Sequence, residues 1–175
     1  MMRWRGAMLD ISRHYFDAQF IKKTISSLAI FNYNTLHLHL TDDQGWRLES
    51  KVFPLLHQVG SIRKHSQNNH GLLEPTFDVV EHSGYLTHED VREIIVHATS
   101  LGIQVIPEIN IPGHTGALLA AYPQFGINQN PVEVSGRWGI SDHLLRPFPE
   151  TFEFLKNVFQ EVDELFPSDY IHVGG

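Results

Sequence analysis

The apolar residues of this chain alternate between two spacings, and this alternation limits the folds that the chain can adopt. A spacing of two residues is typical of a strand with one buried face, and a spacing of about 3.6 residues is typical of a helix. Helical patterns begin at Asp17, which is suited to cap its helix, at Thr87 and at Pro149. Strands that alternate with helices predict an α/β protein with a parallel sheet. The strand patterns lie at 7–12, 35–40, 104–109 and 170–173.

Polar residues on one face of these strands favour a closed barrel over an open sheet. Helices cover both faces of an open parallel sheet, so its strands read as nearly continuous apolar runs. Here the leucines of the 35–40 strand alternate with histidines. We therefore predict a (β/α)₈ TIM barrel, in which functional loops lie at the carboxyl ends of the strands. The residues predicted to face the barrel interior are Asp10, His37, His39, Glu108 and His172.

The length of the chain limits how much of a barrel it can form. A complete barrel needs roughly 250 residues, and this chain has 175. Four strands alone leave unpaired edges and an open inner face. We therefore expect residues 1–175 to be the N-terminal half of a barrel, a fragment with the first four βα units, and the remainder of the barrel to be its partner. The segment 41–86 lacks a regular spacing, which is typical of a functional loop or of small hairpins.

Composition excludes several classes of partner. Acidic residues outnumber basic ones by 20 to 13, which gives a formal net charge of -7, and no dense cluster of Lys and Arg occurs. We therefore expect no nucleic-acid partner. The apolar runs are far shorter than the ~20 residues that cross a bilayer, so no membrane segment is predicted. The absence of cysteine excludes disulfides and thiolate metal sites within the chain.

Three polar side chains are expected on the rim of the predicted barrel. Arg13 follows the first strand, Asp42 the second and His114 the third. The donor fork of Arg13 is suited to vicinal sugar hydroxyls, and Asp42 is suited to orient the imidazole of His114. Taken singly, Arg13 is more typical of a surface charge, Asp42 is equally compatible with a tight turn, and His114 is equally compatible with a loop histidine that has no function. Their shared position favours a site. Trp46 is suited to stack on a sugar, although packing of the loop is the favoured interpretation.

The pair His37 and His39 supports an alternative function. Two histidines at this spacing hold zinc in some barrel hydrolases, which would make the protein a metal-dependent hydrolase. A polar barrel interior explains the pair equally well. A non-catalytic, sugar-binding remnant of a barrel is a third hypothesis.

The most distinctive motifs of the chain are WRGAMLDISRH at 4–14, NTLHLHLTDDQGWR at 34–47, VIPEINIPGH at 105–114 and YIHVGG at 170–175. Together and in this order they resemble the catalytic domain of glycoside hydrolase family twenty. The resemblance spans essentially the whole chain. Asn110 departs from the Asp of many members, and a neutral amide there changes the local charge without necessarily removing activity.

This resemblance implies a β-N-acetylhexosaminidase, which removes terminal non-reducing N-acetylhexosamine from chitin oligosaccharides or glycoconjugates. The family is retaining and substrate-assisted. The 2-acetamido oxygen of the substrate attacks the anomeric carbon to give an oxazolinium intermediate, while an Asp orients the amide and the adjacent Glu protonates the leaving oxygen. That Asp-Glu pair directly follows the motif that ends at Gly175, so we expect the catalytic residues just beyond the chain and no activity in the isolated chain.

The resemblance also implies roles for residues within the chain. Arg13 would bind the 3- and 4-hydroxyls of the terminal sugar, and Asp42 with His114 would contact the substrate site and support the missing Glu. Apart from the resemblance, the inward-facing His39, Glu108 and His172 are weaker candidates for site residues. Neither a cofactor nor a metal ion is expected. The compartment is not fixed by these residues, although the family favours the periplasm, the cell surface or secretion.

Overall fold

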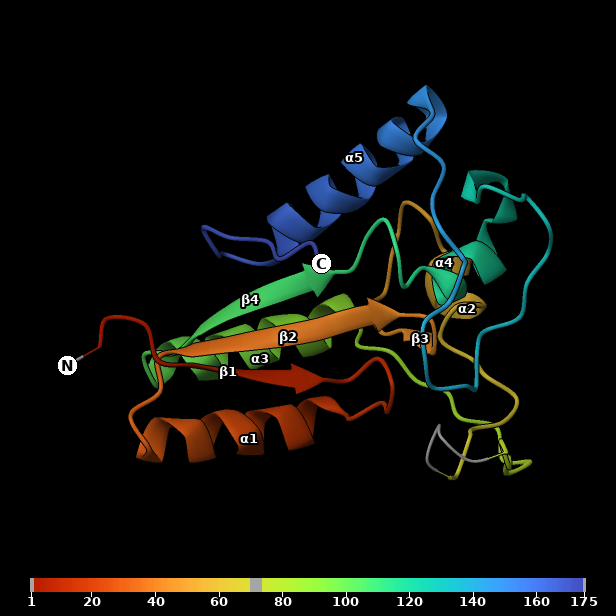
Figure 1. The fold of residues 1–175 in the computed structure, drawn as a ribbon. Helices are drawn as coiled ribbons and strands as arrows, with labels where there is room; N and C mark the ends of the chain where they lie inside the picture. Colours follow the sequence, from red (N-terminus) through yellow and green to blue (C-terminus); the bar gives the residue numbers. More distant parts are fainter. Residues whose placement is uncertain (1, 70–73, 175) are drawn as a thin grey trace.

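Three parallel strands form the centre of the molecule in a computed structural model, which describes residues 2–69 and 74–174. Figure 1 shows strands β1 (Gly6–Asp10), β2 (Thr35–Asp42) and β4 (Gln104–Ile109) side by side with their arrowheads toward the same end. β2 lies in the middle and pairs in parallel with both neighbours. The predicted α/β fold with a parallel sheet is therefore confirmed, and the third strand has the predicted bounds.

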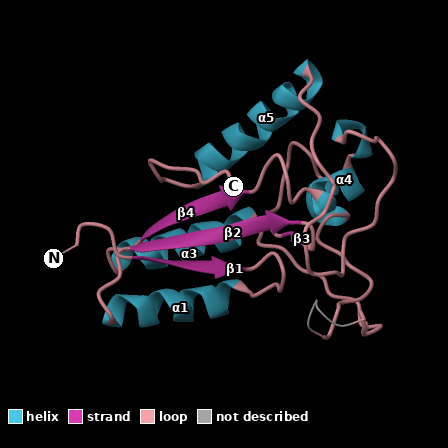
Figure 2. Cartoon of the chain, in the orientation of Figure 1, coloured by secondary structure: helices cyan, strands magenta, loops and turns pink. Residues whose placement is uncertain are grey.

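Helices α1 (Ala18–Ile30), α3 (His88–Ser100) and α5 (Pro149–Leu165) flank the sheet, as Figure 2 shows. Each begins where its capping pattern predicts: the carboxylate of Asp17 accepts a hydrogen bond from the amide of Phe20, and Pro149 occupies the first turn of α5. The leucines at 36, 38 and 40 of β2 are fully buried in the core between sheet and helices. No helix in the described part of the chain is long and apolar enough to cross a membrane.

A capping box closes the first turn of α3. Thr87 Oγ1 accepts from the amide of Asp90 at 3.1 Å, and the amide of Thr87 donates to Asp90 Oδ2 at 2.8 Å. We expect Thr87→Ala to lower the free energy of unfolding by about 1 kcal/mol, because the first turn loses an acceptor. Chemical denaturation measures this, with Thr99→Ala on the exposed surface of the same helix as the control. Equal effects of the two variants would contradict the capping role.

The register of the strands separates a polar face from an apolar one. Asp10 pairs with His39, which in turn pairs with Glu108, so the three residues form one row across the sheet. Side chains in one row of a parallel sheet lie on the same face. The predicted polar inner face is therefore present. His172 lies beside it, since it forms a single parallel bridge with Glu108.

The fourth predicted strand differs from the prediction. Residues 170–173 run parallel to β4, with hydrogen bonds from the amide of His172 to the carbonyl of Pro107 and from the amide of Ile109 to the carbonyl of His172. The segment contributes one isolated bridge and no continuous ladder, so it is not a strand here. The apolar spacing of the helix that begins at Pro149 predicts an inner face of Phe152, Leu155, Phe159, Val162 and Phe166. This prediction is wrong at Phe152, which is 59% exposed. The buried stripe of α5 follows Thr151, Phe154, Val158, Val162 and Leu165.

Short elements that the sequence did not predict gather beyond the strand arrowheads (Figure 1). They are β3 (Gly45–Trp46), α2 (Leu55–Gln58), α4 (Gly116–Ala121) and the 3₁₀ turn η1 (Pro123–Phe125). β3 turns back against the end of β2. Trp46 is buried, and its indole nitrogen donates to the carbonyl of Leu48 at 2.8 Å. The favoured interpretation, that Trp46 packs the loop, agrees with this position.

A buried arginine ties these connecting segments together. The side chain of Arg47 is fully buried. Its guanidinium donates five hydrogen bonds to four backbone carbonyls, those of Ser12, Gln44, Ser61 and Gly84. Burial lowers the pKa of Arg47 to about 9, and the nearby charge of Arg63 acts in the same direction. The loops after β1 and β2 are therefore fixed by one cation.

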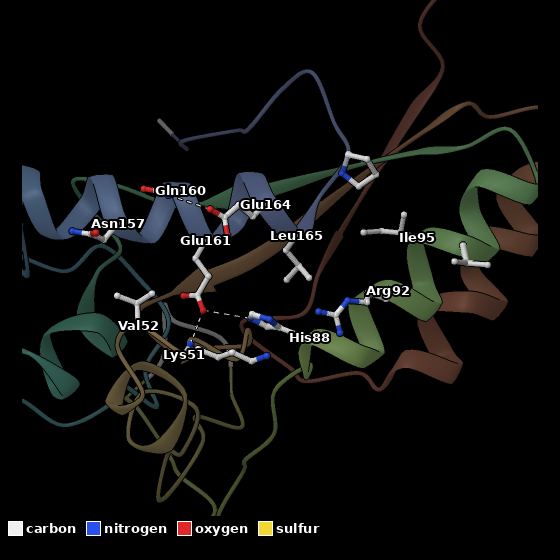
Figure 3. A pocket seen from close by; sticks show the side chains of 12 residues that line it. Lys51, Val52, His88, Arg92, Ile95, Asn157, Gln160, Glu161, Glu164 and Leu165 are labelled. Carbon is white, nitrogen blue, oxygen red and sulfur yellow. Dashed lines mark hydrogen bonds and ion pairs between the residues drawn. The ribbon is translucent and has the colours of Figure 1, made fainter.

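A groove of about 730 Å³ lies between α3 and α5 (Figure 3). In it, the carboxylate of Glu161 accepts from Ser50 Oγ and from the amide of Lys51, each at 2.6 Å. The Nε2 atom of His88 lies 3.5 Å from the same carboxylate. These contacts fasten α5 to the loop after β3 and to the first turn of α3.

Candidate functional site

Polar side chains converge where β1, β2 and β4 end. Arg13 follows β1, Asp42 is the last residue of β2, and His114 lies in the turn after β4. The structure brings these three predicted residues into direct contact. We call the group to which they belong the strand-end cluster, and it consists of Asp10, Arg13, His39, Asp42, Asp43, Glu108 and His114.

The carboxylate of Asp42 is the centre of this cluster, and its side chain is fully buried. Its Oδ2 atom lies 2.7 Å from Arg13 Nη2 and 2.9 Å from His39 Nε2. Its Oδ1 atom lies 3.0 Å from His114 Nδ1 and accepts from the amide of Asp43 at 2.7 Å. A buried carboxylate needs such partners, because desolvation of an unpaired charge is costly. Donors from three separate strand ends thus meet on one carboxylate.

Arg13 is held by three acceptors. Besides Asp42, its Nη1 atom donates to Asp10 Oδ2 at 2.5 Å and its Nε atom donates to Gln44 Oε1 at 3.0 Å. The Arg13 side chain remains 25% exposed. A guanidinium fixed in this way keeps a defined orientation and can still donate to a ligand.

His114 adopts a left-handed backbone conformation, with φ of 54°, which is uncommon outside glycine. Its Nδ1 atom lies 3.3 Å from Asp43 Oδ2 as well as near Asp42. Asp43 also accepts from the amide of Gly116 at 2.9 Å, at the start of α4. The imidazole is 39% exposed. His114 is therefore oriented by two carboxylates while part of its ring faces outward.

His39 joins the cluster to the polar inner face. Its Nε2 atom faces Asp42, and its Nδ1 atom lies 2.8 Å from Glu108 Oε2. Glu108 also meets His37 Nε2 at 2.5 Å, and its Oε1 atom lies 3.6 Å from His172 Nδ1. The rings of His37 and His172 stack with centroids 4.4 Å apart. Of the weaker candidates, His39 and Glu108 are nearly buried, and His172 is 47% exposed.

The charges of the cluster compensate one another. Burial would raise the pKa of Asp42, but the hydrogen bond with His39 and the charge of Arg13 hold it below its ordinary value. Burial would lower the pKa of His39, but hydrogen bonds to Asp42 and Glu108 raise it to about 9. Burial raises the pKa of Asp43. A fixed anion at Asp42 therefore lies beside a fixed cation at His39.

Two groups of side chains lie close enough to share a metal ion, with ligand atoms within 4.8 Å of one another. They are His37, Glu108 and His172, and Asp42, Asp43 and His114. His37 and His39, the pair that the alternative function would use to hold zinc, do not belong to one of these groups together. Both rings instead contact the same oxygen of Glu108. Both ring nitrogens of His39 face carboxylates, so His39 has no lone pair directed at a metal ion.

Sequence reasoning missed the residues that support the predicted trio. Gln44 and Asp43 hold Arg13 and His114 respectively, and Asp10 was predicted only as an inward-facing residue. Their position in the sequence could have indicated Asp43 and Gln44 as site residues, because the run from Asp42 to Gln44 lies at the end of a buried strand. Residues at strand ends of parallel βα units lie where ligands bind. Asn110 also contacts the cluster, with its Nδ2 atom 3.4 Å from Asp42 Oδ2.

Comparisons with known proteins agree with this geometry. Residues 2–175 match glycosyl hydrolase family 20, catalytic domain. A β-hexosaminidase of Vibrio furnissii is 40% identical over 98% of this chain and 28% of its own length. A solved β-N-acetylhexosaminidase superposes with a TM-score of 0.91 at 40% identity, covering 99% of this chain and 35% of the other. An exo-β-N-acetylglucosaminidase of Vibrio harveyi, solved in complex with N-acetylglucosamine, gives a TM-score of 0.79 at 34% identity over 98% of this chain and 27% of the other. The chain thus spans about a quarter to a third of the length of these proteins.

Proposed function

This chain belongs to glycosyl hydrolase family 20, and from that premise we propose that the protein containing it hydrolyses terminal non-reducing N-acetylhexosamine residues. The solved family members that it matches are hexosaminidases with TIM-barrel catalytic domains. The substrate class would be an oligosaccharide or glycoconjugate that ends in an N-acetylhexosaminide.

The contact between Arg13, Asp42 and His114 carries this proposal. Arg13 would donate to the 3- and 4-hydroxyls of the terminal sugar, since its guanidinium is fixed by carboxylates and still partly exposed. A fork of fixed donors suits vicinal hydroxyls. Asp42 would hold that guanidinium and the imidazole of His114 in a constant relation, because both contact its carboxylate.

The proposed reaction is substrate-assisted and retaining. The acetamido oxygen of the substrate forms a bond to the anomeric carbon while the glycosidic bond breaks, and a Glu gives its proton to the leaving oxygen. Water then opens the oxazolinium intermediate. The Asp that orients the amide and the Glu would follow Gly175. The Nδ1 atom of His114 is taken by Asp42, and among the described residues Nε2 has no recorded partner, which suits it to contact that Glu.

We further propose that residues 1–175 are the N-terminal half of the barrel. The inner face of the sheet supports this, because Met8, which lies on the same face of β1 as Asp10, is 57% exposed. Apolar side chains on the inner face of a barrel are normally covered by the opposite strands. The remainder of the barrel would cover them.

The test is to read the coding sequence beyond Gly175 and to assay the complete protein on a chromogenic N-acetylglucosaminide with and without chelator. We expect an Asp-Glu pair directly after Gly175, release that chelator does not reduce, and no release by the 175-residue chain alone. The acid-base group that is missing from the isolated chain typically contributes 10²–10⁴-fold. Loss of activity in chelator would instead support the metal-dependent alternative, and an uninterrupted frame without the pair would contradict both the mechanism and the substrate class.

A further inference from the structure

We propose that Glu108 and His39 are positioning residues that fix the carboxylate of Asp42 from the inner face of the sheet. This inference rests on the proposed function, because it assigns a task within the same reaction. Neither residue needs to touch the sugar. Their role would be to position Asp42 and not to bind the substrate.

The geometry of His39 is the first support. Its two ring nitrogens lie 2.9 Å from Asp42 and 2.8 Å from Glu108, and its side chain is only 5% exposed. A neutral imidazole has one N–H group and can donate to only one of these carboxylates. Donation to both requires the imidazolium form. The ring is thus a cation clamped between carboxylates from two neighbouring strands.

The contacts of Asp42 are the second support. Two cationic groups, Arg13 Nη2 and His39 Nε2, share its Oδ2 atom, and His114 takes Oδ1. A neutral His39 would keep its proton on Nε2 beside Asp42 but would no longer supply a positive charge to that buried carboxylate. Asp42 would then lose part of its charge compensation, and Arg13 and His114, which share its oxygens, would shift with it. Misplacement by about 1 Å is enough to slow a reaction about 100-fold.

Glu108 is the third support, because it stabilises the protonated form of the His39 ring. The groups that face His39 are Asp10 and Arg13 from the β1 end, Asp42 and His37 from its own strand and Glu108 from β4, and His37 contacts the same oxygen of Glu108. Glu108 contributes both a hydrogen bond and a negative charge. If Glu108 lost its charge, the pKa of His39 would fall from about 9 toward its ordinary value of 6.5. His39 would then lose its proton as the pH rises through neutrality.

The experiment is a pH profile of kcat/KM for the complete protein and for Glu108→Gln. We expect the variant to remain within a few-fold of the wild type at about pH 5.5, where His39 stays charged, and to fall at least roughly tenfold below it at about pH 8. Glu108→Asp keeps the charge and should restore much of the alkaline activity. A loss by the same factor at every pH, or no loss at pH 8, would overturn the inference.

A matched control is Glu161→Gln in the α3–α5 groove, where another buried carboxylate meets a histidine (Figure 3). This variant should lower the melting temperature and leave the shape of the pH profile unchanged. The wild-type protein with ¹⁵N-labelled histidine gives an independent answer, whether or not the variants fold. An imidazole with both ring nitrogens protonated at about pH 8 is expected, and its absence would also overturn the inference. An inactive wild type that shows this imidazolium would count against the proposed function alone.

Discussion

Replacement of Asp42 by Asn should reduce kcat/KM of the complete protein by about 100-fold or more. Asp42 positions Arg13 and His114, and misplacement of such groups by about 1 Å is enough to slow a reaction about 100-fold. The side chain of Asp42 is fully buried, and three cationic or imidazole groups meet its carboxylate. An amide of the same size removes the charge and presents an N–H group to at least one of those donors. Initial rates on a chromogenic N-acetylglucosaminide measure the effect.

The control for this variant is Asp163→Asn, which makes the same chemical change on the exposed surface of α5. It should change kcat/KM by less than about twofold, since exposed charges contribute little. Circular dichroism separates loss of the site from loss of the fold. A folded Asp42→Asn protein with wild-type rates would show that Arg13 and His114 do not depend on this carboxylate.

Replacement of Arg47 by Met should destabilise the protein by about 4 kcal/mol or more. Each buried polar group that loses its partner costs about 1–3 kcal/mol. The carbonyl of Gln44 would keep its donor Arg63, but those of Ser12, Ser61 and Gly84 would lose their contact with Arg47. Methionine fills part of the space but donates no hydrogen bond. The segments that would lose their common anchor include the loop that carries Arg13 and the one that carries Gln44. Chemical denaturation gives the change in the free energy of unfolding.

Arg92→Met is the matched control for Arg47. Arg92 is 55% exposed and forms a surface ion pair with Glu89. Such pairs contribute about 0–1 kcal/mol. If both variants lost the same stability, the hydrogen bonds from Arg47 to the carbonyls would not explain the loss.

Local patterns were enough to predict most of the regular structure. Asp17 and Thr87 cap the helices that they were expected to cap, and the 104–109 strand has the predicted ends. These features depend on neighbouring residues and therefore appear in the sequence. The short helix α4 did not appear, because six residues are too few to establish a helical spacing. The apolar spacing also placed Phe152 on the buried face of α5. That face depends on the elements against which the helix packs, and the local sequence does not specify them.

The candidate site also combines features that local sequence patterns predict with features that depend on contacts between distant segments. Position after a buried strand was sufficient to predict Arg13, Asp42 and His114 as neighbours. The arrangement of His39 between two carboxylates depends on the register of β2 against β4, which no local pattern specifies. The buried state of Arg47 depends on carbonyls from four separate segments. Composition alone would place an arginine at the surface.

The groove between α3 and α5 shares no lining residue with the strand-end cluster. Mutations at the two places should therefore be nearly additive, because distant sites without shared partners act independently. Substitutions at groove positions such as Val96 and Asn157 should therefore change heat tolerance without changing the contacts of Asp42 with Arg13 and His114.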